Sequence, residues 1–147
     1  MTPRPLDPAT TGEKLRLLEE LVDALRSLSP VSGEQLRTDV VVRLAVERAL
    51  TQAVDLVVSV CGHVLSAEDA PVPGTYREVV SRAAAGGLLE EELGGSLGRA
   101  VGVRNLLVHR DGRVDLDLVA AAVPTAVHDL ASFITQVAGW LQERTRR

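Results

Sequence analysis

Apolar side chains recur every three or four residues along most of this chain, which is the spacing of one buried face of an α-helix. Leucines and valines at this spacing predict a first helix over residues 11–28, preceded by a loose tail of residues 1–10. An apolar seam that begins near Asp115 predicts a long last helix, which Pro124 should kink or split.

Three further helices are predicted between these two. The first covers residues 33–66, because this valine-rich stretch is far longer than a β-strand and has no internal break before Gly62. The others cover residues 75–85 and 89–109, and "AAGG" between them is typical of a helix end. We therefore expect an all-α bundle of about five helices, forming a single domain over residues 11–147.

Composition supports a folded, water-soluble chain and a cytoplasmic location. The 147 residues are 46% apolar and 24% charged, as in ordinary globular domains. The single cysteine excludes an internal disulfide and suits a reducing compartment. The N-terminus does not resemble a signal peptide, and the longest apolar run is interrupted well before the roughly 18 residues of a membrane span. We expect no membrane association.

The net charge of −4 provides no general attraction to nucleic acid, but the charge is unevenly spread. Four arginines and one acid lie between Arg99 and Arg113, so a local basic patch could hold phosphates. The alternative is a general arginine bias, because Lys14 is the only lysine in the chain.

The stretch "VGVRNLLVHRDG" places polar side chains in an apolar helical pattern. Arg104 falls within the apolar stripe of the 89–109 helix, and an unpaired buried cation is very costly. It must therefore pair with an acid or face a partner or ligand. The structural interpretation is a salt bridge to Asp55 or Glu47, which belong to a polar stripe on the 33–66 helix.

That stripe also includes Ser59 and His63, and it is either a solvated face or the lining of a site that pairs with a buried cation. No group of side chains has the spacing of metal ligands, and Cys61 with His63 is better explained as core than as a ligand pair. We expect no metal and no cofactor.

Asn105 and His109 are four residues apart, so the amide can orient the imidazole. Arg104 and His109 are five apart, about 140° around a helix. These two side chains converge on one phosphate only across a groove or with a second copy of the helix, which indicates a dimeric site.

Gly94, Gly98 and Gly102 leave a bare strip along the same helix, although each interior glycine costs about 1 kcal/mol relative to alanine. Close approach of another helix would offset that cost, and we expect this helix to come from a second copy of the chain. The alternative is simply a weak helix.

These residues resemble a known family. The stretch "VGVRNLLVHRDGRVDLDLV" resembles the G-[FV]-R-N-x-L-V-H segment of the HepT-like HEPN proteins, and "PVPGTYREVVSRAAAGGLLEEEL" is similar to their P-x-x-Y-R-E segment. The likeness extends over residues 11–144 in the same order. It implies a dimeric helical bundle that is the toxin of a toxin–antitoxin pair, a metal-independent ribonuclease whose antitoxin is a small nucleotidyltransferase.

By position in the family motif, Arg104 and His109 match the catalytic pair, and Asn105 matches the polar residue that supports it. Asp111 stands where the family commonly has a tyrosine that the antitoxin modifies with AMP. A carboxylate cannot be the same acceptor, so the resemblance does not imply that the antitoxin silences this chain by adding AMP at this position.

The chemistry suits these side chains without a metal, because RNA supplies its own nucleophile in the 2′-hydroxyl. A histidine ordinarily titrates near pH 6.5 and can move a proton at neutral pH, while a guanidinium can grip a phosphate in two places. The main hypothesis is an endoribonuclease toxin. The alternative is a non-catalytic helical module that binds and regulates a nucleotidyltransferase, and a structural bundle without a partner is a third.

Overall fold

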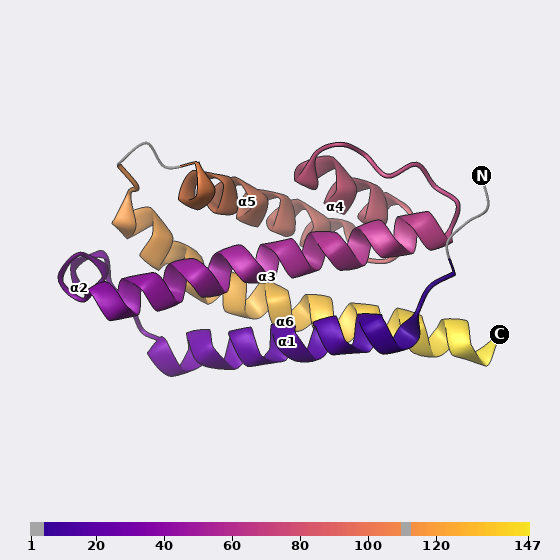
Figure 1. Ribbon diagram of the computed structural model, residues 1–147, viewed down its shortest axis with the longest axis horizontal. Coiled ribbons are helices and arrows are strands. Elements are labelled where there is room, and N and C mark those ends of the chain that lie inside the picture. Colours follow the sequence, from indigo (N-terminus) through magenta and orange to yellow (C-terminus); the bar gives the residue numbers. More distant parts are fainter. Residues whose placement is uncertain (1–4, 110–112) are drawn as a thin grey trace.

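The computed structural model describes residues 5–109 and 113–147, and the described chain folds into six α-helices with no β-strand (Figure 1). The prediction of an all-α bundle is therefore confirmed. The helices in chain order are α1 (Pro8–Leu28), α2 (Gly33–Thr38), α3 (Val40–Ala67), α4 (Tyr76–Ala85), α5 (Glu91–Val108) and α6 (Leu116–Arg146).

The expected single helix over residues 33–66 is wrong, because Asp39 divides it into α2 and α3. The backbone of Asp39 is extended, with φ −113° and ψ 99°, and its side chain accepts a hydrogen bond from the backbone N–H of Val42 at 3.1 Å. Aspartate is a favoured N-cap because this bond satisfies a donor that the first turn leaves open. The apolar period continues on both sides of the break and conceals it.

Two other expectations concern the start of α1 and the effect of Pro124 on α6. α1 begins at Pro8, with Asp7 as its N-cap, so residues 8–10 are helical and do not belong to a tail. Pro124 lies inside α6, which continues through it to Arg146, so of the two expected effects, a kink or a split, the split does not occur. The packed neighbours of α6 hold it in place where proline removes one backbone donor.

α3 is the central helix of the bundle, since it contacts all five other helices. Its buried residues are mostly valine, leucine and alanine, and they pack with leucines of α1 and apolar side chains of α5 and α6. Phe133 of α6 is the largest fully buried side chain. In this arrangement one side of α3 packs against α1, and another side packs against α4 and α5.

α3 and α6 are also long and apolar enough to cross a membrane by length and composition, each with a mean hydropathy of 1.4 over an 18-residue window. This differs from the expectation that no segment qualifies, because a few polar residues hardly lower the average. Within the described bundle, 56% of the α3 window and 33% of the α6 window is buried. A core helix of a soluble protein passes the same test, since its buried faces must be apolar.

Candidate functional site

Arg104 is held by an ion pair with α3, as the structural interpretation predicted. Its Nε donates to Oδ1 of Asp55 at 3.0 Å, and only 17% of the arginine side chain is exposed. The other candidate acid, Glu47, instead lies 3.9 Å from Arg43 of its own helix. The charge of the partly buried Arg104 in the apolar stripe of α5 is therefore balanced by a carboxylate from a neighbouring helix.

Tyr76, the tyrosine of the P-x-x-Y-R-E segment, completes the surroundings of Arg104, although the sequence analysis gave it no role in the site. It is the first residue of α4, and its ring centre lies 4.6 Å from Cζ of Arg104, within the range of a cation–π contact. The available signal was its rarity, because Tyr76 is the only tyrosine in the chain. α3 and α4 thus fix the guanidinium from two directions.

Asn105 contacts Arg104 and not the imidazole that it was expected to orient. Nη1 of Arg104 donates to Oδ1 of Asn105 at 3.3 Å, and no hydrogen bond joins Asn105 to the ring of His109 in the described part of the chain. Together with the Asp55 bond, this contact uses two of the five N–H donors of the guanidinium. The others are available to a phosphate.

His109 lies at the C-cap of α5, as predicted, and its side chain is exposed. Its backbone N–H donates to the carbonyl of Asn105 at 2.9 Å, which fixes the end of the helix. Among the described residues, neither Arg104 nor Asn105 has a side-chain hydrogen bond to the imidazole. Asp111, the expected position of the family's modified tyrosine, lies outside the described residues.

The glycine strip faces α4 of the same chain, so its assignment to a second copy is wrong. A Cβ added at Gly94 would lie 2.7 Å from Cβ of Ala84, and one added at Gly102 would lie 3.1 Å from Nη2 of Arg77. The missing side chains let α4 approach α5 closely. Close helix contact was the right physical reason, but the partner helix is intramolecular.

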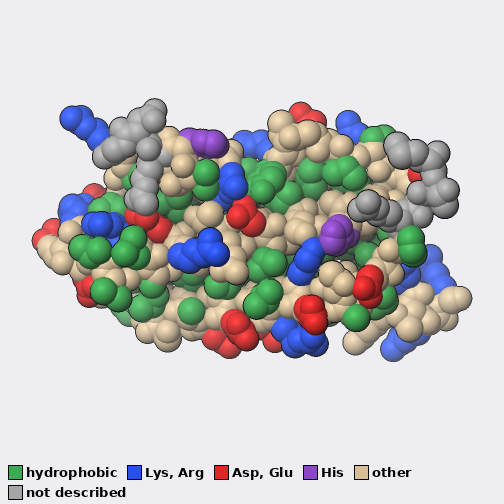
Figure 2. Space-filling view, viewed as in Figure 1, with side chains coloured by type: hydrophobic (Ala, Val, Ile, Leu, Met, Phe, Trp, Pro, Cys, Tyr) green, Lys and Arg blue, Asp and Glu red, His purple; other side chains and the backbone are tan. Residues whose placement is uncertain are grey.

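Large exposed apolar side chains gather at the end of the bundle where α5 stops. Six of the eight such side chains in the described chain lie at the start of α3, the end of α5 or the start of α6, and these three helix ends are neighbours in Figure 1. Figure 2 shows apolar atoms gathered around the start of α3 at this end. The six residues are Val40, Val41, Leu44, Leu106, Val108 and Leu118.

Ser59 and His63, the last two residues of the polar stripe on α3, lie beside Lys14 of α1. Nζ of Lys14 donates to Oγ of Ser59 at 2.6 Å and lies 3.3 Å from Nδ1 of His63. Partial burial lowers the pKa of Lys14. Pairing with cations, one of the two interpretations of this stripe, therefore applies here as well as at Asp55. Cys61, by contrast, is fully buried, and burial raises the pKa of its thiol to about 12, so it is a neutral core residue.

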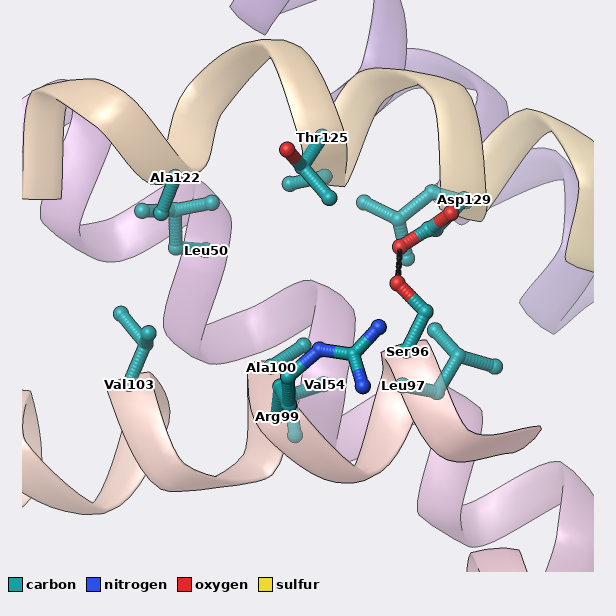
Figure 3. A pocket seen from close by; sticks show the side chains of 12 residues that line it. Leu50, Val54, Ser96, Leu97, Arg99, Ala100, Val103, Ala122, Thr125 and Asp129 are labelled. Carbon is teal, nitrogen blue, oxygen red and sulfur yellow. Dashed lines mark hydrogen bonds between the residues drawn. The ribbon is translucent and has the colours of Figure 1, made fainter. Parts of the chain in front are cut away.

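A separate apolar pocket of about 150 Å³ lies between α5 and α6, with α3 behind it (Figure 3). At one edge, the hydroxyl of Ser96 donates to the carboxylate of Asp129, which is 7% exposed. The Arg99 side chain extends over the same pocket in Figure 3. The pocket is on the α6 side of α5, whereas Arg104 is on the side covered by α3 and α4.

The sequence profile of the HepT-like ribonuclease family matches residues 17–137 of this chain. Comparison with curated proteins gave no match. Among solved structures, the tri-AMPylated HEPN toxin of Shewanella oneidensis in complex with its MNT antitoxin is similar, with a TM-score of 0.79 and 20% identity over 88% of this chain and 96% of that chain.

Two further structures share the fold. A toxin–antitoxin structure with AMP-PNP has a TM-score of 0.77 and 20% identity, covering 86% of this chain and 96% of that one. YutE, a cytosolic protein of unknown function from Bacillus subtilis, has a TM-score of 0.80 and 14% identity, covering 95% and 93%. The expected resemblance is thus confirmed at the level of sequence family and of fold.

Proposed function

Because the chain belongs to the HepT-like ribonuclease family, we propose that it is the toxin of a toxin–antitoxin pair and cleaves RNA without a metal. The observation that carries this proposal is the state of Arg104. Its guanidinium is held in place by Asp55 and Tyr76, yet it keeps N–H donors for which no described residue is the acceptor. A fixed cation with open donors is suited to binding a phosphate that becomes more negative during reaction.

In the proposed mechanism, the 2′-hydroxyl of RNA attacks the adjacent phosphate and the bond to the 5′-oxygen of the next nucleotide breaks. His109 takes the proton from the 2′-hydroxyl or returns one to the leaving oxygen. Arg104 binds the non-bridging oxygens and stabilises their charge. The products are a 2′,3′-cyclic phosphate and a free 5′-hydroxyl.

The proposed active form is a two-fold dimer in which each site combines Arg104 of one copy with His109 of the other. Two observations support it. In the described part of one chain no hydrogen bond joins these two side chains, and exposed apolar residues gather at the end of α5. A two-fold interface is self-complementary, so one composite site implies a second. The glycine strip gives no support, because it packs against α4.

The proposed antitoxin is a small nucleotidyltransferase, and RNA as substrate implies a cytoplasmic location. The similar Shewanella oneidensis toxin is described as tri-AMPylated. In this chain Asp111 offers no hydroxyl at the family's acceptor position. We therefore expect the Asp111→Tyr variant to accept AMP from the cognate enzyme, and the natural protein to accept none at this position.

The decisive experiment uses the purified protein without its partner, incubated with tRNA and mRNA in EDTA. The expected result is cleavage that leaves 2′,3′-cyclic phosphate ends and disappears in the His109→Ala variant. Intact RNA with a folded dimer, or cleavage that EDTA abolishes, would contradict the mechanism. The first outcome would favour the alternative, a non-catalytic module that binds a nucleotidyltransferase.

A further inference from the structure

Arg77 of α4 lies along the bare backbone of α5. A Cβ added at Gly98 would lie 4.0 Å from Cγ of Arg77, and one added at Gly102 would lie 3.1 Å from its Nη2. The aliphatic part of the side chain therefore passes Gly98, and the guanidinium reaches Gly102. Alanine at Gly102 would require the guanidinium to move by a few tenths of an ångström, so this glycine lets Arg77 lie directly against the backbone of α5.

Arg77 differs from its neighbour Arg104 in its surroundings. Within the described part of the chain, no carboxylate lies within salt-bridge distance of Arg77, whereas Arg104 is 3.0 Å from Asp55. Arg77 is exposed, and none of its five N–H donors has a hydrogen-bond acceptor among the described residues. A planar guanidinium binds phosphate oxygens in pairs, which makes an anion of this class its best-matched ligand.

The same side chain lines a groove of about 750 Å³ between α4 and α5, a size within the usual range of binding pockets. The α5 wall is largely bare backbone, from Gly94, Gly95 and Gly98. Ser81 adds a hydroxyl, whereas the guanidinium of Arg99, another lining residue, extends over the pocket between α5 and α6 (Figure 3). Among the described lining residues the one acid is Glu91, which lies at the opposite end of the groove, in the first turn of α5.

The Arg77 end of this groove lies beside the candidate catalytic side chains. Tyr76, whose ring contacts Arg104, directly precedes Arg77. Gly102, which the Arg77 guanidinium reaches, lies two residues before Arg104, a rise of about 3 Å along the axis of α5. A strand of RNA with its reacting phosphate at Arg104 would therefore have a neighbouring phosphate near Arg77 of the same copy.

We propose that the groove between α4 and α5 binds the RNA strand next to the cleaved bond, and that Arg77 holds a phosphate that does not react. This inference rests on the proposed ribonuclease function and specifies how its substrate is bound. Arg77 is in this view a binding residue, separate from proton transfer at His109. It should therefore affect affinity and KM more than kcat.

The test measures binding of a fluorescein-labelled single-stranded RNA to the full-length protein in the uncleaving His109→Ala background, across a series of salt concentrations. Arg77→Ala should weaken the Kd about tenfold. It should also make the slope of log affinity against log salt shallower by about 0.7, the value for one lost phosphate contact on a single strand. Arg82→Ala is the matched control, because Arg82 is an exposed arginine of the same helix outside the groove.

A second pair of variants tests the placement of the charge without removing it. Gly102→Ala should weaken RNA binding several-fold, since the added Cβ displaces the Arg77 guanidinium. Gly139→Ala is the control, because it is also a helical glycine and a Cβ there meets nothing within 4 Å. Both changes raise helix propensity equally, so a difference between them reports the position of Arg77.

The outcomes separate this inference from the ribonuclease proposal. If the wild type cleaves RNA but Arg77→Ala and Arg82→Ala have equal affinities and salt slopes, the groove is not the binding site. If RNA binding depends on Arg77 but the wild type cleaves nothing, the ribonuclease proposal is wrong and the binding groove stands. Circular dichroism on each variant verifies that it is folded.

Discussion

Arg104 and His109 lie five residues apart on the same helix, yet their surroundings are opposite. The guanidinium is 17% exposed and is held by Asp55 from α3 and Tyr76 from α4. The imidazole is exposed at the C-cap of α5, where only its backbone has a hydrogen bond among the described residues. One member of the candidate pair belongs to the packed bundle, and the other lies at its edge.

This difference separates the two roles physically. The position of Arg104 is decided by intramolecular contacts, so its loss should affect both the stability and the chemistry of the protein. Among the described residues, His109 is held only by the hydrogen bond of its backbone N–H, so its side chain can be oriented by RNA or by a second copy of the chain. Substitutions at the two residues should therefore differ in kind as well as in size.

The largest expected effect is loss of cleavage in His109→Ala, by about 10²–10⁴-fold, since proton transfer by a positioned side chain contributes about that much. Because the imidazole is exposed, the free energy of unfolding should change by less than about 0.5 kcal/mol. Cleavage rates and urea unfolding measure the two quantities. His128→Ala, an exposed histidine on α6, is the control and should leave both unchanged. Full activity in His109→Ala would remove the imidazole from the mechanism.

Arg104→Ala should lower both activity and stability, with a cost in unfolding free energy of about 1–3 kcal/mol, because Asp55 and Tyr76 both lose their partner. Arg104→Lys keeps the charge for Asp55 but lacks the two-pronged grip on phosphate. It should restore stability more fully than cleavage, as urea unfolding and cleavage rates will show. Equal recovery of stability and of cleavage in Arg104→Lys would mean that Arg104 contributes only its positive charge and not its two-pronged geometry.

Asp55→Asn should lower stability less than Arg104→Ala does. It should also strengthen RNA binding, whereas Arg104→Ala should weaken it. Because Asp55 is 41% exposed, its pair with Arg104 is partly screened, and the loss of unfolding free energy should be about 0.5–1 kcal/mol. The arginine is then no longer neutralised, so RNA affinity should increase at low salt, measured by fluorescence anisotropy. Weaker RNA binding in a folded variant would show that Asp55 is needed to aim the guanidinium.

Tyr76→Leu should lower the free energy of unfolding by about 0.5–1 kcal/mol, from loss of the cation–π contact with Arg104. Trp140→Leu provides a matched control, because Trp140 makes a similar contact with Arg144, at 5.1 Å on α6. Thermal unfolding should show similar losses in the two variants, and only Tyr76→Leu should slow RNA cleavage. Equal cleavage rates would indicate that Tyr76 stabilises the bundle without positioning Arg104 for reaction.

Local sequence signals predicted the helices well because each acts over a few residues. Apolar spacing identifies a buried helical face, and Ser32 and Thr75 cap α2 and α4 through side-chain bonds to backbone N–H groups. Asp39 uses the same chemistry, but a valine-rich pattern continues across it and conceals the break. The sequence also drew attention to Arg104 and His109 as candidates, since a cation within an apolar stripe and a flanking imidazole are conspicuous in such a helix.

The sequence by itself determined that α5 has an apolar face interrupted by Arg104, a bare glycine face, and His109 at its end. Only the tertiary structure decided what covers each face. Asp55 and Glu47 were equal candidates to pair with Arg104, and the docking of α5 against α3 selected Asp55. The glycines face α4, so the close helix contact is intramolecular. Helical spacing tells which side chains share a face, but long-range packing alone decides which neighbour that face meets.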